Sequence, residues 1–115
     1  IKKIAKLINL NTKFEISSKL NVSGKKTDKI INICKKLKTN NYLINKGALQ
    51  YITEDKKKFV ENNINLYLLD FKINSYNQSS KSFIKELSIL DLIFNEGPNT
   101  LNFLRSSYLL KKIKF

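Results

Sequence analysis

The sequence predicts an α/β domain, a Rossmann-like three-layer sandwich in which a short parallel sheet of about three strands is flanked by helices. Three observations predict this fold class. Apolar residues recur at helical spacing in several segments, short apolar runs of strand length stand between them, and helix-length crossovers separate these runs. Because strands joined by helical crossovers lie parallel with helices on their faces, the alternation predicts this sandwich.

Helices are predicted in the first two thirds of the chain. The first covers Ile1–Ile8, whose apolar residues follow the spacing that gives a helix one apolar stripe. A second is expected to begin at Thr27, a good N-cap, with Asp28 in the first turn where the helix dipole favours a negative charge. Thr53 is expected to cap a third helix. Asn62 and Asn63 are expected to end it, because asparagine tolerates the left-handed backbone conformation.

Three strands are predicted between these helices. Phe14–Ile16 alternates apolar and charged residues, and Tyr42–Ile44 is a short continuous apolar run, as in a strand buried on both faces. Leu66–Leu69 lies in the strongest strand pattern of the chain. The polar run 72–82, rich in serine and asparagine, is predicted to be a loop.

A further helix is predicted after this loop. Ser88 stands three residues before Asp91, the spacing of a capping box, and apolar residues that can pack on the sheet follow. Asp91 therefore fits helix capping, with catalysis as the alternative. Gly97-Pro98 is expected to stop this helix and to begin another, because proline is preset for a first helical turn.

Length and composition predict a single α/β domain over residues 1–115. The chain has 115 residues of which 42% are hydrophobic, enough for one modest core. It begins with Ile1 in a helical pattern, so we expect a portion of a longer protein. Cys34 is the one cysteine and shares an apolar helix face, which favours core packing and a reducing, cytoplasmic setting. No apolar run reaches the length that spans a bilayer.

The charge of the chain favours an anionic partner, but its composition weakens that interpretation. The net charge is +13, from 22 Lys and Arg against 9 Asp and Glu. Arg105 is the one arginine, however, and proteins that recognise phosphates or base edges favour arginine for its bidentate geometry. The abundant lysine, asparagine and isoleucine are typical of an AT-rich genome. Nucleic acid is therefore not the expected partner.

Several catalytic and cofactor classes are excluded by residues that the chain lacks. There is no histidine, so neither a Ser-His-Asp nor a Cys-His arrangement can form within it. Glycine occurs three times, too few and too scattered for a GxGxxG or P-loop motif, so an NAD site is not expected. One cysteine without histidine provides too few ligands for a zinc site. The pattern identifies no cofactor.

Candidate site residues lie where the predicted strands end. In a parallel sheet every strand brings its carboxyl end to the same edge, and ligands bind there. The hydroxyls, amides, ammonium group and carboxylate that gather at this edge suit a sugar, a phosphate or a nucleotide-sugar better than an apolar ligand. The predicted substrate-binding residues are Ser17, Ser18, Asn45, Lys46, Gly47, Asp70, Tyr76 and Gln78. Asp70, the carboxylate of the set, is the candidate catalytic residue.

These residues also have structural interpretations. Ser17 and Ser18 can simply close a turn, and Gly47 can serve a backbone bend. Asp70 fits a hydrogen-bonding residue at a strand end as well as it fits a ligand contact.

Three ordered blocks of the sequence resemble the WbqC-like protein family. The first runs from Ser17-Ser18-x-Leu20 to Tyr42-Leu43, and the second from Tyr51-Ile52 to Tyr76-x-Gln78. The third is the most specific, because it is nearly the signature LSILDLLFN.GP that is associated with the family. It reads Leu87-Ser88-Ile89-Leu90-Asp91-Leu92-Ile93-Phe94-Asn95-x-Gly97-Pro98.

The chain departs from the family pattern in two places. Ile44-Asn45-Lys46 stands where the family continues Ser-Gly-Pro, and Ile73-Asn74 replaces a His-Pro pair. The resemblance covers the C-terminal portion of the family, so we expect the N-terminal half of the full-length protein as a partner. No role for the family histidine can be carried over to this chain.

The resemblance implies a role in the assembly of bacterial O-antigen or a related surface polysaccharide. The expected activity is that of a transferase acting on a sugar or nucleotide-sugar. The alternatives are a basic nucleic-acid-binding module, which would show a steep salt dependence of binding, and a non-catalytic interaction domain. The latter is favoured if the polar groups of the sheet edge are filled by the chain's own side chains.

Overall fold

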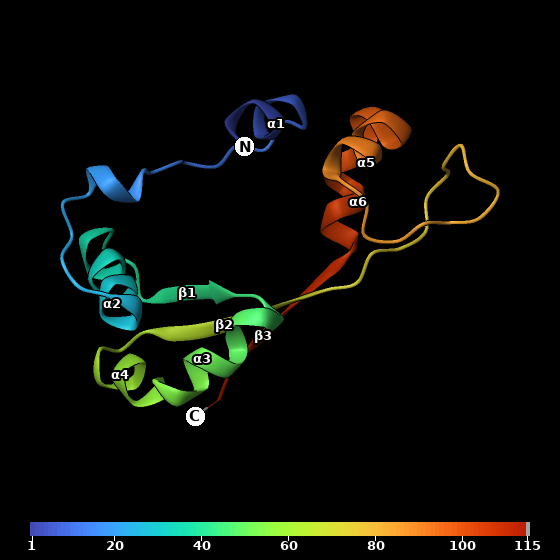
Figure 1. Ribbon diagram of the computed structural model, residues 1–115. Coiled ribbons are helices and arrows are strands. Elements are labelled where there is room, and N and C mark those ends of the chain that lie inside the picture. The colour runs from blue at the N-terminus through green and yellow to red at the C-terminus, as the bar shows by residue number, and fades with distance from the viewer. Residues whose placement is uncertain (115) are drawn as a thin grey trace. The chain divides into compact units, whose positions relative to one another are not determined.

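The computed structural model describes residues 1–114, which divide into two compact units. The first unit contains residues 1–14 and 71–108, and the second contains residues 15–70 together with the segment from Leu109 onward. Each unit is described by itself below, with the elements as labelled in Figure 1. The prediction of one domain over residues 1–115 stays a prediction.

A three-stranded mixed sheet forms the centre of the second unit. Strands β1 (Asn41–Ile44) and β2 (Asn65–Phe71) pair in parallel, with Tyr42 opposite Leu66 and Ile44 opposite Leu68. Both strands were expected, and their parallel pairing follows from the helical crossover between them. β2 is the central strand, and β3 (Tyr108–Lys112) lies on its other side.

Strand β3 runs antiparallel to β2. The Ile113 amide donates to the Leu66 carbonyl at 2.9 Å and the Lys72 amide donates to the Ser107 carbonyl at 2.8 Å, so the two chains advance in opposite directions. This corrects the prediction of an all-parallel sheet. The predicted strand Phe14–Ile16 is also wrong, because no strand forms at these three residues, which are exposed.

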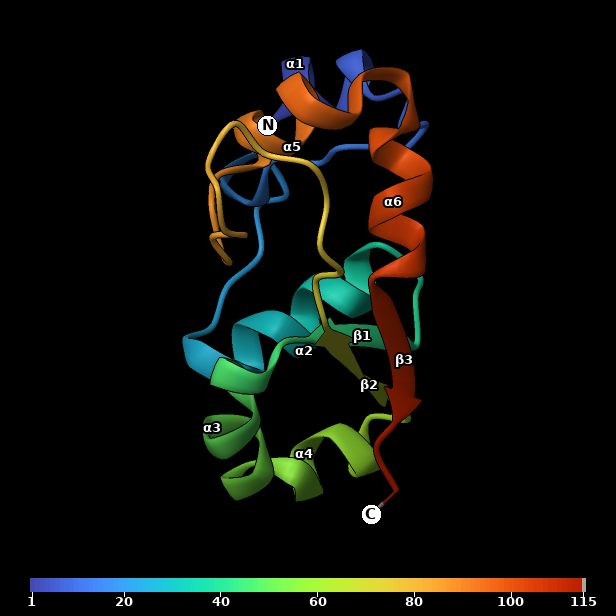
Figure 2. The ribbon, with the colours of Figure 1, turned by 90° about the vertical axis from the view of Figure 1, so that its right-hand side faces the viewer.

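Helices α2 (Lys26–Lys36), α3 (Leu49–Glu54) and α4 (Lys56–Glu61) bury one face of β1 and β2. In Figures 1 and 2, α3 and α4 lie on the same side of these strands. Phe59 and Leu66 are fully buried at the centre, and the ring of Tyr42 stacks on that of Phe59 with 6.2 Å between centroids. The core residues come from all three helices and both strands, namely Ile31, Cys34, Ile44, Ile52, Phe59, Ile64 and Leu66.

The other face of the sheet carries a second set of apolar side chains. Successive strand residues point to opposite faces, so Leu43 and Tyr67 lie opposite to the core residues beside them. Leu43 is exposed, and Tyr67 is half-buried. The Rossmann-like three-layer arrangement therefore stays a prediction, while the mixed α/β class is confirmed.

Two predicted helix caps are wrong for local reasons. Helix α2 begins at Lys26, so Thr27 lies inside its first turn, and the Thr27 hydroxyl donates to Asp55 at 2.5 Å. Thr53 lies within α3, where its hydroxyl donates to the Leu49 carbonyl. Both hydroxyls therefore donate to oxygen atoms and, within residues 1–114, accept no hydrogen bond from a free amide at a helix start. Asn63 does adopt the left-handed backbone, with φ 53°, just after α4.

The first unit contains three short helices, α1 (Lys2–Leu7), α5 (Ile89–Glu96) and α6 (Thr100–Ser106). Gly97 ends α5 with φ 51°, a value that glycine adopts without strain, and Pro98 lies in the 3-10 turn before α6. Leu92 and Thr100 are buried in this unit. No helix within residues 1–114 has the length and apolar character that a membrane crossing requires.

Ser88 caps α5 as predicted, because its hydroxyl oxygen accepts a hydrogen bond from the Leu90 amide at 3.2 Å. The packing of α5 on the sheet stays a prediction. We expect Ser88→Ala to lower the free energy of unfolding by about 1 kcal/mol, because an unsatisfied helix amide replaces a bonded one. Urea denaturation measures the loss. Ser82→Ala, in the exposed loop, is the matched control, and an equal loss in both variants would contradict the cap.

Candidate functional site

Two lysine side chains contact the carboxylate of Asp70 near the carboxyl ends of β1 and β2. Asp70 is 5% exposed and points to the same face as Leu66 and Leu68. Lys111 of β3 donates to Oδ2 at 2.7 Å. Lys46, just after β1, places its ammonium nitrogen 2.6 Å from Oδ1, an ion-pair contact without hydrogen-bond geometry. The three strands are thus tied together by one buried charge.

The two lysines keep Asp70 ionised. The hydrogen bond from Lys111 is the largest cause, and with the contact from Lys46 it lowers the pKa of the Asp70 carboxyl from 3.8 to about 2, against the opposing effect of desolvation. A carboxylate with so low a pKa is a poor proton acceptor near neutral pH. Its position favours the structural interpretation of Asp70 over a catalytic one.

The candidate residues next to Asp70 also have structural roles within the chain. The Asn45 side-chain oxygen accepts a hydrogen bond from the Ala48 amide at 2.9 Å and so caps the short 3-10 turn Lys46–Ala48. Gly47 lies within that turn. The structure therefore brings Asn45, Lys46, Gly47 and Asp70 to one edge as expected, and adds Lys111, which the sequence did not indicate. Their role in substrate binding stays a prediction.

Ser17 and Ser18 do not lie at this edge. They form an exposed 3-10 turn, Ser17–Lys19, in place of the residues that would follow a strand. In Figure 1 this light-blue turn lies on the α2 side of the unit, away from the end toward which β1 points. Because Phe14–Ile16 is no strand, the reason for placing these serines at the sheet edge is lost.

Tyr76 and Gln78 meet Asp91 in the first unit. The Tyr76 hydroxyl donates to Asp91 Oδ2 at 2.7 Å, and Gln78 Nε2 donates to the same oxygen at 3.2 Å. Gln78 also exchanges hydrogen bonds with the backbone of Ile84, which donates its amide at 2.8 Å and accepts at the carbonyl at 3.0 Å. The glutamine thus fixes the loop against the first turn of α5.

Aromatic packing holds the Tyr76 ring in place. Tyr76 is buried, and Phe83 and Phe103 meet its ring edge-to-face with centroids 5.2 and 5.4 Å away. Burial and then the hydrogen bond to Asp91 raise the pKa of the Tyr76 phenol. Tyr76 therefore stays a neutral hydrogen-bond donor to the carboxylate at physiological pH.

Asp91 and Gln78 line a cavity of about 350 Å³. Ser79 and Ser80 contribute hydroxyl groups, and Ile84 and Leu87 contribute apolar walls. Sequence reasoning assigned Asp91 to helix capping, yet its carboxylate binds Tyr76 and Gln78, 15 and 13 residues earlier in the chain. The sequence feature that could have indicated a site at Asp91 is its position in the block Leu87–Pro98, which carries the family resemblance.

Other candidates have structural roles. Cys34 is buried in the core, and burial raises the pKa of its thiol, so it is not an activated nucleophile. Among residues 1–114 no group of three or more Cys, Asp and Glu side chains is arranged to hold a metal ion.

The Asp70 ion pairs predict a pH dependence of stability. Because the folded pKa of about 2 lies below the ordinary 3.8, the paired carboxylate stabilises the fold above about pH 4 and loses that effect as pH falls toward 2. We expect Asp70→Asn to lower the free energy of unfolding at pH 7, with the difference from wild type shrinking between pH 4 and 2. Urea denaturation at a series of pH values measures this difference.

Glu54→Gln is the matched control for this experiment, because Glu54 is exposed on α3 and no ion pair is described for it among residues 1–114. It removes the same charge without breaking a buried contact. A loss of stability that is equal in the two variants, or independent of pH, would contradict the role of Asp70.

Comparison with known proteins agrees with the resemblance seen in the sequence. Residues 1–103 match the WbqC-like protein family. A relative in Mycobacterium tuberculosis, the uncharacterized protein Rv1507c, is 27% identical over 103 residues, which are 89% of this chain and 44% of the relative. The chain thus spans less than half the length of that relative. No solved structure matches this chain significantly. The match over most of its length shows that the chain belongs to the WbqC-like protein family.

Proposed function

We propose that this chain acts in the biosynthesis of bacterial O-antigen or a related surface polysaccharide, and that it binds the sugar part of a sugar or nucleotide-sugar. The cavity that contains Asp91 and Gln78 is the proposed site. The observation that carries the proposal is the half-buried Asp91 carboxylate, which is held by Tyr76 and Gln78 at one oxygen while it lines a cavity.

The chemistry of this cavity suits a polyhydroxylated ring. Asp91 Oδ2 accepts from two side chains, and no partner of Oδ1 is described within residues 1–114, so Oδ1 can accept from a sugar hydroxyl. Ser79 adds a hydroxyl that both donates and accepts, and Ile84 and Leu87 can pack against the C–H groups of the ring. A volume of about 350 Å³ is at the lower end of ligand pockets and suits a single sugar unit.

The proposed reaction is group transfer onto a sugar hydroxyl. In such a transfer the hydroxyl oxygen bonds to the transferred group, the donor's leaving group departs with its electron pair, and a base takes the hydroxyl proton. Asp91 is the carboxylate at the cavity, and the chain has no histidine for this step. We propose that Asp91 Oδ1 is the base that accepts the hydroxyl proton.

The proposal includes a partner and a location. The chain spans 44% of its mycobacterial relative, and we expect the remainder of a full-length protein to complete the site and to supply the group donor. A cytoplasmic location belongs to the same proposal, since nucleotide-sugars are made and used there.

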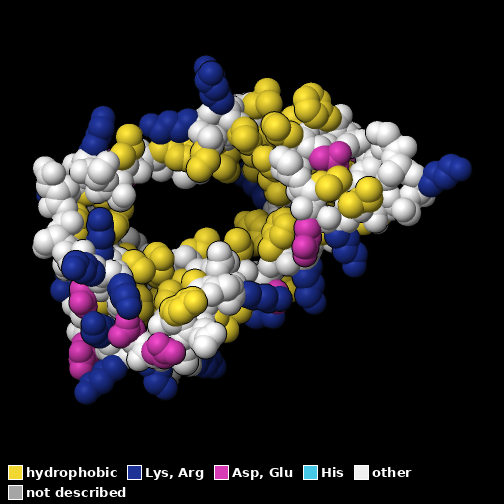
Figure 3. Space-filling model, in the orientation of Figure 1, with side chains coloured by type: hydrophobic (Ala, Val, Ile, Leu, Met, Phe, Trp, Pro, Cys, Tyr) yellow, Lys and Arg dark blue, Asp and Glu magenta, His cyan; other side chains and the backbone are white. Residues whose placement is uncertain are grey.

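The net charge of +13 favours nucleic-acid binding as the second candidate function. In Figure 3, the Lys and Arg side chains around α2 and α4 of the second unit are interspersed with Asp and Glu side chains. A dedicated nucleic-acid surface would concentrate such charges along one groove or helix. A steep fall of DNA affinity between about 50 and about 200 mM salt would support this alternative.

The sugar site is tested by NMR titration of the labelled protein with glucose, UDP-glucose and UDP. We expect glucose and UDP-glucose to shift the amide signals of Gln78, Ser79 and Asp91. Asp91→Asn should weaken binding about 10-fold, because a hydrogen bond to a charged acceptor is replaced by a neutral one.

Asp28→Asn is the control, since it removes the same charge from the surface of α2, outside the cavity. Equal weakening in both variants, or shifts that UDP produces as strongly as UDP-glucose, would overturn the proposed sugar site.

A further inference from the structure

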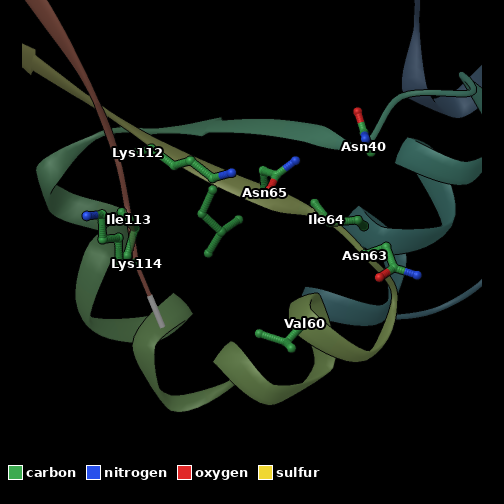
Figure 4. A pocket seen from close by; sticks show the side chains of 9 residues that line it. Asn40, Val60, Asn63, Ile64, Asn65, Lys112, Ile113 and Lys114 are labelled. Atoms are coloured by element: carbon green, nitrogen blue, oxygen red, sulfur yellow. The ribbon is translucent and has the colours of Figure 1, made fainter.

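The second unit contains a cavity of about 620 Å³ at the amino-terminal ends of its parallel strands. Asn40 directly precedes β1, Asn65 begins β2, and Lys112 ends β3, so this cavity lies at the end of the sheet opposite to Asp70. Figure 4 shows Val60 pointing into it from α4 and the Lys112 side chain extending toward Asn65. Neither the sequence patterns nor the family resemblance pointed to this place.

Two lysine side chains give this cavity positive charge. Lys112 and Lys114 line it, and none of its lining residues within 1–114 carries a carboxylate. No ion pair of either lysine is described within residues 1–114, whereas the adjacent Lys111 is paired with Asp70. An anion that enters the cavity would therefore meet the ammonium groups of both lysines.

The same cavity has carboxamides with bonding capacity to spare. Asn65 donates to the Asn41 side chain at 3.3 Å and retains its own oxygen as an acceptor. No side-chain hydrogen bond of Asn40 or Asn63 is described within residues 1–114, and both residues line the cavity. A carboxamide donates and accepts at once, which is what recognition of a hydroxyl group requires.

We propose that this cavity binds a sugar phosphate, with the phosphate at Lys112 and Lys114 and the sugar hydroxyls at the three asparagines. Val60, which is exposed on α4 and points into the cavity, offers an apolar surface on which the ring can rest. The cavity volume of about 620 Å³ accommodates a phosphorylated sugar. This site lies in a different unit from the Gln78–Asp91 cavity and does not depend on the function proposed there.

NMR titration of the labelled chain with glucose 1-phosphate, inorganic phosphate and glucose tests the assignment. We expect glucose 1-phosphate to shift the side-chain amide signals of Asn40, Asn63 and Asn65 at lower concentration than inorganic phosphate does. Glucose alone should act more weakly than either, because it gains no contact with the lysines. If inorganic phosphate binds as tightly as the sugar phosphate, the site is one for phosphate and the sugar assignment is overturned.

The double variant Lys112→Gln with Lys114→Gln should weaken binding of glucose 1-phosphate by about 5-fold, as the loss of two partly exposed charge contacts implies. Lys35→Gln with Lys36→Gln, at the end of α2, removes the same charge outside the cavity. Well-dispersed amide spectra and unchanged size-exclusion profiles verify that both double variants are folded and do not self-associate, since lysines on an edge strand also hinder strand pairing.

Equal weakening by the two double variants would show nonspecific attraction to a cationic chain and would overturn the site. The absence of shifts at Asn40, Asn63 and Asn65 in the wild type would overturn it as well. A sugar phosphate that shifts these three residues in the Asp91→Asn chain would show that this cavity works independently of the proposed sugar site.

Discussion

The buried carboxylate of Asp70 is the contact on which the arrangement of the sheet depends. It joins β2, which carries it, to Lys46 just after β1 and to Lys111 of β3, 41 residues farther along the chain. The residues of β3 are exposed along the strand, so this strand gains little from core packing. Backbone hydrogen bonds and the Lys111 ion pair hold it in place. A buried charge without such partners would be costly, whereas here two cations compensate its desolvation.

The sequence was informative where structure is local and less so where it depends on distant partners. The apolar runs Tyr42–Ile44 and Leu66–Leu69 predicted β1 and β2, because burial against helices requires that pattern. Phe14–Ile16 alternates apolar and charged residues, a pattern that also favours a strand, but no strand forms at these residues. Strand β3 has both faces partly in solvent, and its pattern therefore has no clear period. Its partner β2 lies far away in the sequence, and pairing over that distance is not encoded in spacing.

The candidate residues divide in the same way. The parallel order of β1 and β2 was sufficient to place Asn45, Lys46 and Asp70 at one edge. There, however, Lys46 pairs with Asp70, and Asn45 caps the adjacent 3-10 turn. Gln78 was selected because it follows β2, but its partner Asp91 was interpreted as a helix cap. The loop between Gln78 and Asp91 brings these two side chains together, and no regular sequence spacing predicts such a contact. The two cavities also differ in charge. The Gln78–Asp91 cavity is lined by a carboxylate, and the cavity at the amino-terminal ends of the parallel strands is lined by two lysines.

The role of Asp70 can be measured directly at its own carboxyl carbon. A carbon-13 NMR titration of the folded chain follows the ionisation of this one group, and the two lysine contacts predict a midpoint of about 2. Replacing Lys111 by glutamine should raise that midpoint, because the largest cause of the low pKa is removed. A midpoint near the ordinary 3.8 in the wild type, or one that Lys111→Gln leaves unchanged, would contradict the account.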